Sequence, residues 1–211
     1  MRIALGWKAH SGWAALVAIG YQRKEFRVVD RRRIELVSER DPHWPGQPYH
    51  AADGKSPAQA RRIVERGMAD ARACAHAELR AALARAHDEG HEVVACGVLT
   101  PAPLPDWTTE QILAAHLRMH QAEGALYPDA LLRAAQECDL SGVAIAQKSL
   151  QDHAQTVLRM RFDTAMQQVT ALGKSVGAPW GADQKRAALA AMIALLERDA
   201  TPLPASSPRS A

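Results

Sequence analysis

The sequence is short of the features that mark several protein classes. Its three cysteines, Cys74, Cys96 and Cys138, lie far apart and form no CxxC pair. Neither a disulfide framework nor a zinc knuckle is therefore expected, and the cysteines are predicted to serve packing. A reduced, cytoplasmic location fits this cysteine usage best.

Long apolar runs are also missing. No stretch of about eighteen uninterrupted apolar residues occurs, so we expect no membrane-spanning helix and no membrane partner. Residues 1–20 are apolar but are broken by Lys8, His10 and Ser11. This pattern favours two strands over a signal peptide.

Charge of one sign shows no large excess. The formal net charge is +3, and the arginines are spread over several segments rather than gathered in one basic arm. This balance permits contact with phosphate groups but does not require it. Hydrophobic residues make up 47% of the chain, which is too apolar for a disordered protein and predicts a folded one.

Length and composition predict one α/β domain over residues 1–198 and a disordered tail over 199–211. Within the domain, the segment 38–55 has no periodicity and holds three prolines and two glycines. A structureless loop of this length is more often functional than idle, so we expect a long functional loop there.

Alternating apolar and polar residues predict three consecutive strands at 2–7, 13–20 and 26–36. Their short connections are typical of an antiparallel meander. Strict alternation in the third strand places Asp30 on the same face as the apolar residues, unless a bulge intervenes. Asp30 is then either partnered in a polar pocket or turned to solvent.

Helices alternate with buried strands in the remainder of the chain. Capping boxes at 56–59 and 108–111 mark two helix starts, and Gly124 is expected to interrupt the second helix. The expected elements are helices at 56–90, 108–123, 128–138, 151–172 and 177–197, with strands at 91–100 and 140–147. This order predicts a mixed five-stranded sheet, made of a three-stranded antiparallel meander plus two βα units, flanked by helices.

That order is similar to the ribonuclease H-like fold, and IALGWKAHSGWAALV resembles the first hairpin of this superfamily. The superfamily includes nucleases, Holliday-junction resolvases, transposases and the sugar-kinase and actin ATPases. The resemblance covers residues 2–197 by topology, and by motif only the two ends. The segments QPYHAA, HLRMHQAEG and VGAPWGADQKRAAL also resemble segments that occur together in bacterial proteins, which implies no particular activity.

The resemblance implies that carboxylates at the ends of the first and fourth strands and in the last helix hold two divalent cations. Here Lys8, directly after the predicted first strand, occupies the position of the first carboxylate, and a lysine cannot ligate Mg²⁺. The fourth strand offers Cys96, Gly97 and Val98, and only Asp183 in GADQKRAALAA matches an acid of the resolvase pattern. The resemblance therefore implies a non-canonical or catalytically degenerate member. It does not favour the ATPase activity either, because the phosphate turn of the ATPases starts from the aspartate that this chain lacks.

The stretch HLRMHQAEG holds a candidate metal or acid–base site. His116, His120 and Glu123 fall on one helical face, because offsets of four and seven residues are near one and two full turns. Two imidazoles at this spacing can share a divalent metal such as Zn²⁺. Glu123, one turn further on, then either completes the set of ligands or orients it. The helical protease pattern differs, since Leu117 stands where that pattern has its glutamate. The alternative is a polar helix face without chemistry.

Two further groups are candidates for binding. In QPYH, Tyr49 and His50 offer ligand or acid–base contacts, or else Tyr49 anchors the loop and His50 lies in water. In the first turn, an anion can take the place of the missing metal, or else the turn is merely exposed. The residues expected to bind this anion are Lys8, His10 and Ser11, with Lys185 and Asp183 nearby.

Three functions follow as hypotheses. The first is a binding or assembly module whose partner is nucleic acid or a small anionic ligand. The second is a hydrolase or phosphodiesterase, with or without a divalent metal. Its catalytic candidates are His50, His116, His120, Glu123 and Asp183. The third is a homo-oligomeric accessory protein, in which Trp44 and Trp180 are exposed aromatic anchors.

Overall fold

The computed structural model describes residues 1–38 and 46–200, and in this part of the chain five strands form one mixed sheet. The strands are β1 (Arg2–His10), β2 (Trp13–Gln22), β3 (Glu25–Glu35), β4 (Glu92–Thr100) and β5 (Ser141–Ala146). The sheet order is β3-β2-β1-β4-β5; β1 to β3 form an antiparallel meander, whereas β4 and β5 run parallel to β1. The expected α/β fold with a mixed five-stranded sheet is confirmed.

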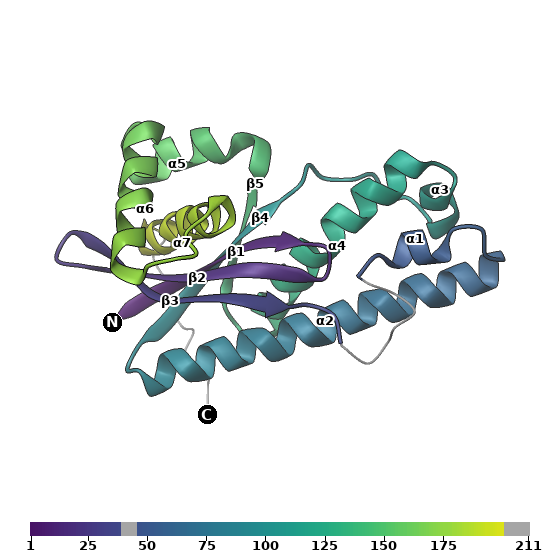
Figure 1. Cartoon of the computed structure of the whole chain (residues 1–211), viewed down its shortest axis with the longest axis horizontal. Helices are drawn as coiled ribbons and strands as arrows, with labels where there is room; N and C mark the ends of the chain where they lie inside the picture. Colours follow the sequence, from purple (N-terminus) through teal and green to yellow (C-terminus); the bar gives the residue numbers. More distant parts are fainter. Residues whose placement is uncertain (39–45, 201–211) are drawn as a thin grey trace, which may run out of the picture.

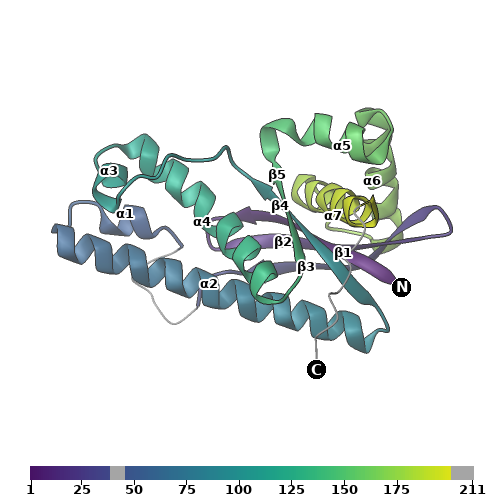
Figure 2. The same ribbon diagram turned by 180° about the vertical axis from the view of Figure 1, so that it is seen from behind.

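Helices cover both faces of this sheet (Figure 1, Figure 2). They are α1 (Pro48–Ala52), α2 (Pro57–Asp88), α3 (Thr109–Leu113), α4 (His116–Glu137), α5 (Leu150–Leu158), α6 (Phe162–Val176) and α7 (Ala182–Ala200), with a 3-10 turn at Gln147–Ser149. Helices α2 and α4 share one apolar core with the sheet, and α5, α6 and α7 share the other. None of the described helices combines the length and apolarity needed to span a bilayer.

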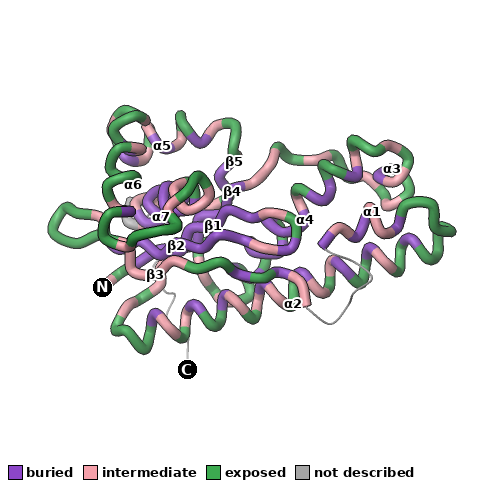
Figure 3. The backbone as a smooth tube through the Cα atoms, in the orientation of Figure 1, coloured by how far each residue is buried: buried purple, intermediate pink, exposed green. Residues whose placement is uncertain are grey.

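Strands β1 and β2 are buried along most of their length (Figure 3). In β1 the side chains alternate between the two cores, because successive residues of a strand point to opposite faces. Ile3, Leu5 and Trp7 belong to the core with α2 and α4. The intervening residues, including Gly6 and Lys8, therefore face α7.

Helix α7 lies directly against the backbone of β1 and β4. Gly6 and Gly97 are register partners in these two strands. A Cβ atom on Gly6 would collide with the carbonyl oxygen of Ala187, and one on Gly97 with that of Ala190. Only glycine fits at these positions, and the alanine-rich run of α7 allows the helix to approach so closely.

A bulge in β3 decides between the two alternatives for Asp30. The register shifts so that Ala18 pairs with Asp30 and Ile19 pairs with Val28. The Asp30 carboxylate accepts a hydrogen bond from Nε of Arg32 at 2.8 Å, and Nε of Arg85 on α2 lies 3.6 Å away. Asp30 is therefore partnered rather than solvated alone.

Part of the segment 38–55 is helical, which corrects the expectation of a structureless loop. Pro48 occupies the first turn of α1, where its missing N–H costs nothing, and a five-residue helix is too short to show a periodic pattern. Residues 39–45, which include Trp44, lie outside the described residues, as do residues 201–211 of the expected tail. Helix α7 runs to Ala200, beyond the expected domain end at 198.

The helices between residues 108 and 176 are divided differently from the prediction. Both capping boxes form, but the chain breaks after α3, and α4 then continues through Gly124 and Pro128. Pro128 removes only one intrahelical bond, and packing of the buried residues around it maintains the helix. The expected helix over 151–172 is divided into α5 and α6 at Arg159, whose left-handed backbone (φ 52°) ends α5.

The contact between α7 and the sheet predicts a sharp difference between two glycines. Gly97→Ala should lower the free energy of unfolding by about 3 kcal/mol or more, because the new methyl group overlaps the α7 backbone. Gly124→Ala is the matched control; open space surrounds its Cβ position, and a helical Gly→Ala change should stabilise by up to about 1 kcal/mol. Urea unfolding followed by circular dichroism measures both, and equal effects would contradict the packing described.

Candidate functional site

Three histidines from two helices converge. His50 lies in α1, His116 is the first residue of α4, and His120 lies one turn later. One ring nitrogen from each lies within 4.8 Å of those of the other two, and the Nε2 atoms of His116 and His120 are 2.9 Å apart. The ring centroid of His50 is 5.5 Å from that of His116 and 4.7 Å from that of His120. With Glu123, these residues are called the histidine cluster below.

Glu123 contacts the backbone and ring of His50 but is not part of the group of three ring nitrogens. Its side chain is only 4% exposed, and Oε1 accepts hydrogen bonds from the backbone N–H groups of Tyr49 (2.8 Å) and His50 (3.3 Å). Nδ1 of His50 lies 3.4 Å from the same oxygen. Burial raises the pKa of the Glu123 carboxyl, and the hydrogen bonds from His50 and Tyr49 oppose this rise.

The approach to α1 is held by contacts to two distant elements. Gly46 has a φ of +77°, and a Cβ atom there would lie 3.1 Å from the backbone N of Gly12 in the β1–β2 turn. The hydroxyl of Tyr127 on α4 donates a hydrogen bond to the carbonyl oxygen of Gly46 at 2.7 Å. The β1–β2 turn and α4 together therefore fix where α1 begins, and so where His50 lies.

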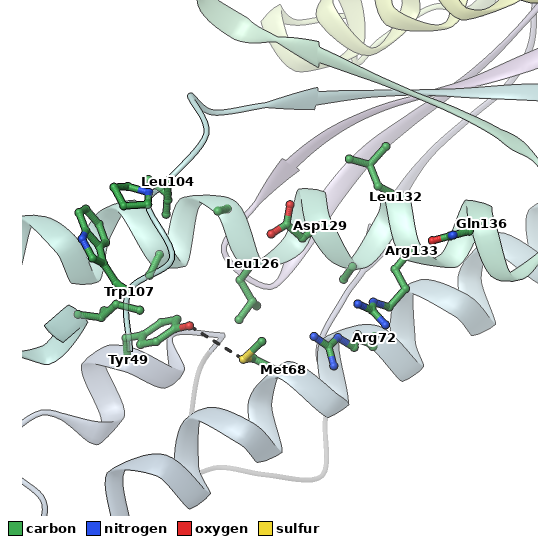
Figure 4. A pocket seen from close by; sticks show the side chains of 15 residues that line it. Tyr49, Met68, Arg72, Leu104, Trp107, Leu126, Asp129, Leu132, Arg133 and Gln136 are labelled. Atoms are coloured by element: carbon green, nitrogen blue, oxygen red, sulfur yellow. Dashed lines mark hydrogen bonds between the residues drawn. The ribbon is translucent and has the colours of Figure 1, made fainter. Parts of the chain in front are cut away.

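A cavity of about 400 Å³ adjoins α1 (Figure 4). Tyr49 lines it, with its hydroxyl 4.0 Å from the sulfur of Met68 on α2. Arg72, Asp129 and Arg133 supply charged groups to its wall. Tyr49 thus has two roles, since its ring borders the cavity while its backbone N–H binds Glu123.

A second polar group lies where β1 ends against the start of α7. Lys8 is 8% exposed, and its Nζ donates to the carbonyl oxygen of Ala9 at 3.2 Å. Burial lowers the pKa of the Lys8 ammonium; the Asp183 carboxylate opposes this shift, and Arg186 adds to it. The Nε2 atom of His10 lies 3.1 Å from Oδ1 of Asp183.

An aromatic stack extends this group. The ring of His10 stacks on that of Trp13 with centroids 4.3 Å apart, and the Arg33 guanidinium lies 4.0 Å from the Trp13 ring centroid. Lys8, His10, Trp13, Arg33 and Asp183 are called the strand-end cluster below. Trp13 and Arg33 are not among the predicted site residues, although pairing of the predicted second and third strands places them on neighbouring strands.

The proposed catalytic residues are thus divided between two places. Asp183 belongs to the strand-end cluster, whereas His50, His116, His120 and Glu123 lie together. Ser11 is exposed in the β1–β2 turn, and Lys185 is half-buried in the first turn of α7.

Trp180 is not an exposed anchor, which corrects the expectation for a homo-oligomer surface. Its Nε1 donates to the carbonyl oxygen of Val169 at 2.9 Å, and its indole ring covers Gly173 so closely that a Cβ atom there would collide with it. The ring therefore packs against α6 and holds the segment that precedes α7 on that helix.

The anchoring of α1 can be tested at Tyr127. Tyr127→Phe should lower the free energy of unfolding by about 1–2 kcal/mol, because it removes a buried hydrogen bond and leaves the Gly46 carbonyl without that donor. Tyr21→Phe, at a 38% exposed tyrosine, is the matched control and should be near neutral. Thermal and urea unfolding measure the two variants, and a neutral Tyr127→Phe would argue against the anchor.

Comparisons with known proteins give a fold-level match. No protein-family model and no curated protein matches the sequence. A structure of Thermus thermophilus RuvC matches with a TM-score of 0.50 and 14% identity, over 94% of this chain and 97% of RuvC. A second, of T. thermophilus RuvC in complex with a Holliday junction substrate, matches with a TM-score of 0.51 and 13% identity, over 92% and 93%. The chain is therefore similar in fold to RuvC, a resolvase of the ribonuclease H-like superfamily, as the element order predicts.

Proposed function

We propose that this chain binds nucleic acid through the strand-end cluster. The observation that best supports this proposal is the match over 92% of the chain to RuvC in complex with a Holliday junction substrate. The fold alone is shared at 13% identity, so the interaction has to be argued from this chain's own residues.

The strand-end cluster has the chemistry for phosphate contacts. Its two basic side chains come from different strands, with Lys8 on β1 and Arg33 on β3, and Arg186 on α7 lies close enough to add to the lowering of the Lys8 pKa. The Lys8 ammonium uses one donor on the Ala9 carbonyl, which leaves two N–H donors for a phosphate oxygen. The positive end of the α7 dipole is at the same place and also favours an anion.

The stack on Trp13 adds a surface suited to nucleic acid. His10 lies flat on the indole, with an interplanar angle of 11°, and the Arg33 guanidinium approaches the same ring. Arg33 also bonds to Glu35 through Nε at 2.7 Å, which orients its terminal nitrogens. A guanidinium held in this way is preorganised for bidentate contact with phosphate.

The same region argues against the two-metal cleavage implied by the superfamily resemblance. Lys8 stands on the first strand where a carboxylate is expected, and its charge repels a divalent cation. On the fourth strand, Gly97 is covered by α7 so closely that no side chain fits there. Binding without the usual nuclease centre is therefore the proposed function.

Binding is tested with a labelled four-way DNA junction titrated with the full chain, with fluorescence anisotropy as the readout at several salt concentrations. Lys8→Met should weaken binding roughly three- to tenfold and reduce the salt slope by about one, since one phosphate contact is lost. Lys174→Met, at an exposed lysine of α6, is the matched control and should change little. Binding without salt dependence, or equal losses in both variants, would contradict the proposal.

The same substitution should stabilise the protein. The folded state holds the pKa of Lys8 below its ordinary value of 10.5, so folding is penalised at pH values below the folded pKa and the penalty fades as the pH rises toward 10.5. At neutral pH, Lys8→Met should raise the free energy of unfolding by about 1 kcal/mol, or Tm by about 2–4 °C. Unfolding curves at neutral and alkaline pH measure this gain, which should shrink in alkali.

A further inference from the structure

We propose that His50, His116 and His120 bind one divalent transition-metal ion, with Glu123 as the positioning residue for His50. This site goes beyond the proposed nucleic-acid binding, because it is built on α1 and α4 rather than on the strand-end cluster. The two proposals use different residues and can fail separately.

The distances between the ring nitrogens suit a shared ion. Two nitrogens bound to one tetrahedral Zn²⁺ at about 2.0–2.1 Å lie about 3.3 Å apart. The Nε2 atoms of His116 and His120 are 2.9 Å apart, and all three ligating nitrogens lie within 4.8 Å. His116 and His120 are exposed at the start of α4. Small rotations of these two side chains therefore bring their nitrogens and that of His50 to the separation that one shared ion requires.

Glu123 supplies what an imidazole ligand needs from its second nitrogen. When Nδ1 of His50 carries the proton and donates to Oε1 of Glu123, Nε2 keeps its lone pair for the metal. The same oxygen also binds the backbone N–H of His50, which fixes the residue as well as the ring. Pairing of a buried carboxylate with a metal-binding histidine is a common support for such ligands.

The buried carboxylate of Glu123 also offsets the unfavourable field of the helix dipole at this position. Three histidines near the N-terminus of α4 lie at the positive end of the helix dipole, which disfavours a cation. Glu123 is 4% exposed, and its Oε2 has no hydrogen-bond partner among the described residues. A negative charge held here offsets the dipole and favours a bound cation.

The donor set selects the class of metal. Imidazole nitrogens favour Zn²⁺, Co²⁺, Ni²⁺ and Cu²⁺, whereas Mg²⁺ and Ca²⁺ prefer oxygen ligands. Three protein ligands leave a position for water, which is typical of catalytic zinc rather than of closed structural sites.

The first experiment titrates Zn²⁺ into the full chain without an affinity tag, using isothermal calorimetry with Mg²⁺ as a comparison ion. We expect one Zn²⁺ per chain and a rise in Tm with added Zn²⁺, but no comparable response to Mg²⁺. The double variant His116→Ala, His120→Ala should lose about 100-fold or more in affinity. Both side chains are exposed, so the fold should survive.

The matched control is His87→Ala, at an exposed histidine of α2, which should bind Zn²⁺ as the parent chain does. The proposal is overturned if the parent chain binds none of Zn²⁺, Co²⁺, Ni²⁺ and Cu²⁺. It is equally overturned if the double variant binds as tightly as the parent, or if His87→Ala removes as much affinity.

The positioning role of Glu123 is tested by a double-mutant cycle on Zn²⁺ affinity. Glu123→Gln alone should weaken binding by about tenfold or more, as loss of a supporting carboxylate does elsewhere. In a His50→Ala background the same change should cost almost nothing, because the ring it positions is gone. Equal losses in both backgrounds would show that Glu123 acts by another route, and circular dichroism of each metal-free variant checks folding.

Discussion

The direct contact between α7 and the backbone of β1 and β4 is the constraint on which the rest of the structure depends. It requires glycine at Gly6 and Gly97 and small residues along the facing side of α7. Close approach maximises dispersion contacts and excludes water from the centre of the sheet. It also sets the chemistry of the edge, because the start of α7 brings Asp183 beside His10 and Lys8.

The opposite face of the sheet positions the histidines by a different device. There α4 packs on the sheet while its first turns extend beyond it (Figure 1, Figure 2). Helix α1 is attached by hydrogen bonds to Glu123 and by the contact of Gly46 with the β1–β2 turn. That turn connects β1, which carries His10, to β2, which carries Trp13. The β1–β2 hairpin therefore helps to position both candidate sites, although the two sites share no residue.

Local patterns predicted the elements well, and tertiary contacts explain what they missed. Alternation located the meander, and the capping boxes located the starts of α2 and α3, because these signals depend on near neighbours. The i, i+4 spacing also placed His116 and His120 together. The arrival of His50 beside them depends on α1, which no periodic signal reveals. The continuity of α4 through Pro128 likewise reflects packing that outweighs local preference.

The double role of Tyr49 has a consequence for how the molecule can respond to its surroundings. Its ring forms part of the cavity wall, while its backbone N–H binds the carboxylate that orients His50. An occupant of the cavity that displaced this tyrosine would change the affinity of the histidines for their own ligand. By thermodynamic reciprocity, filling the histidine cluster would change the affinity of the cavity by the same factor. Tyr49 would thus couple the binding of a ligand in the cavity to the binding of a metal by the histidines.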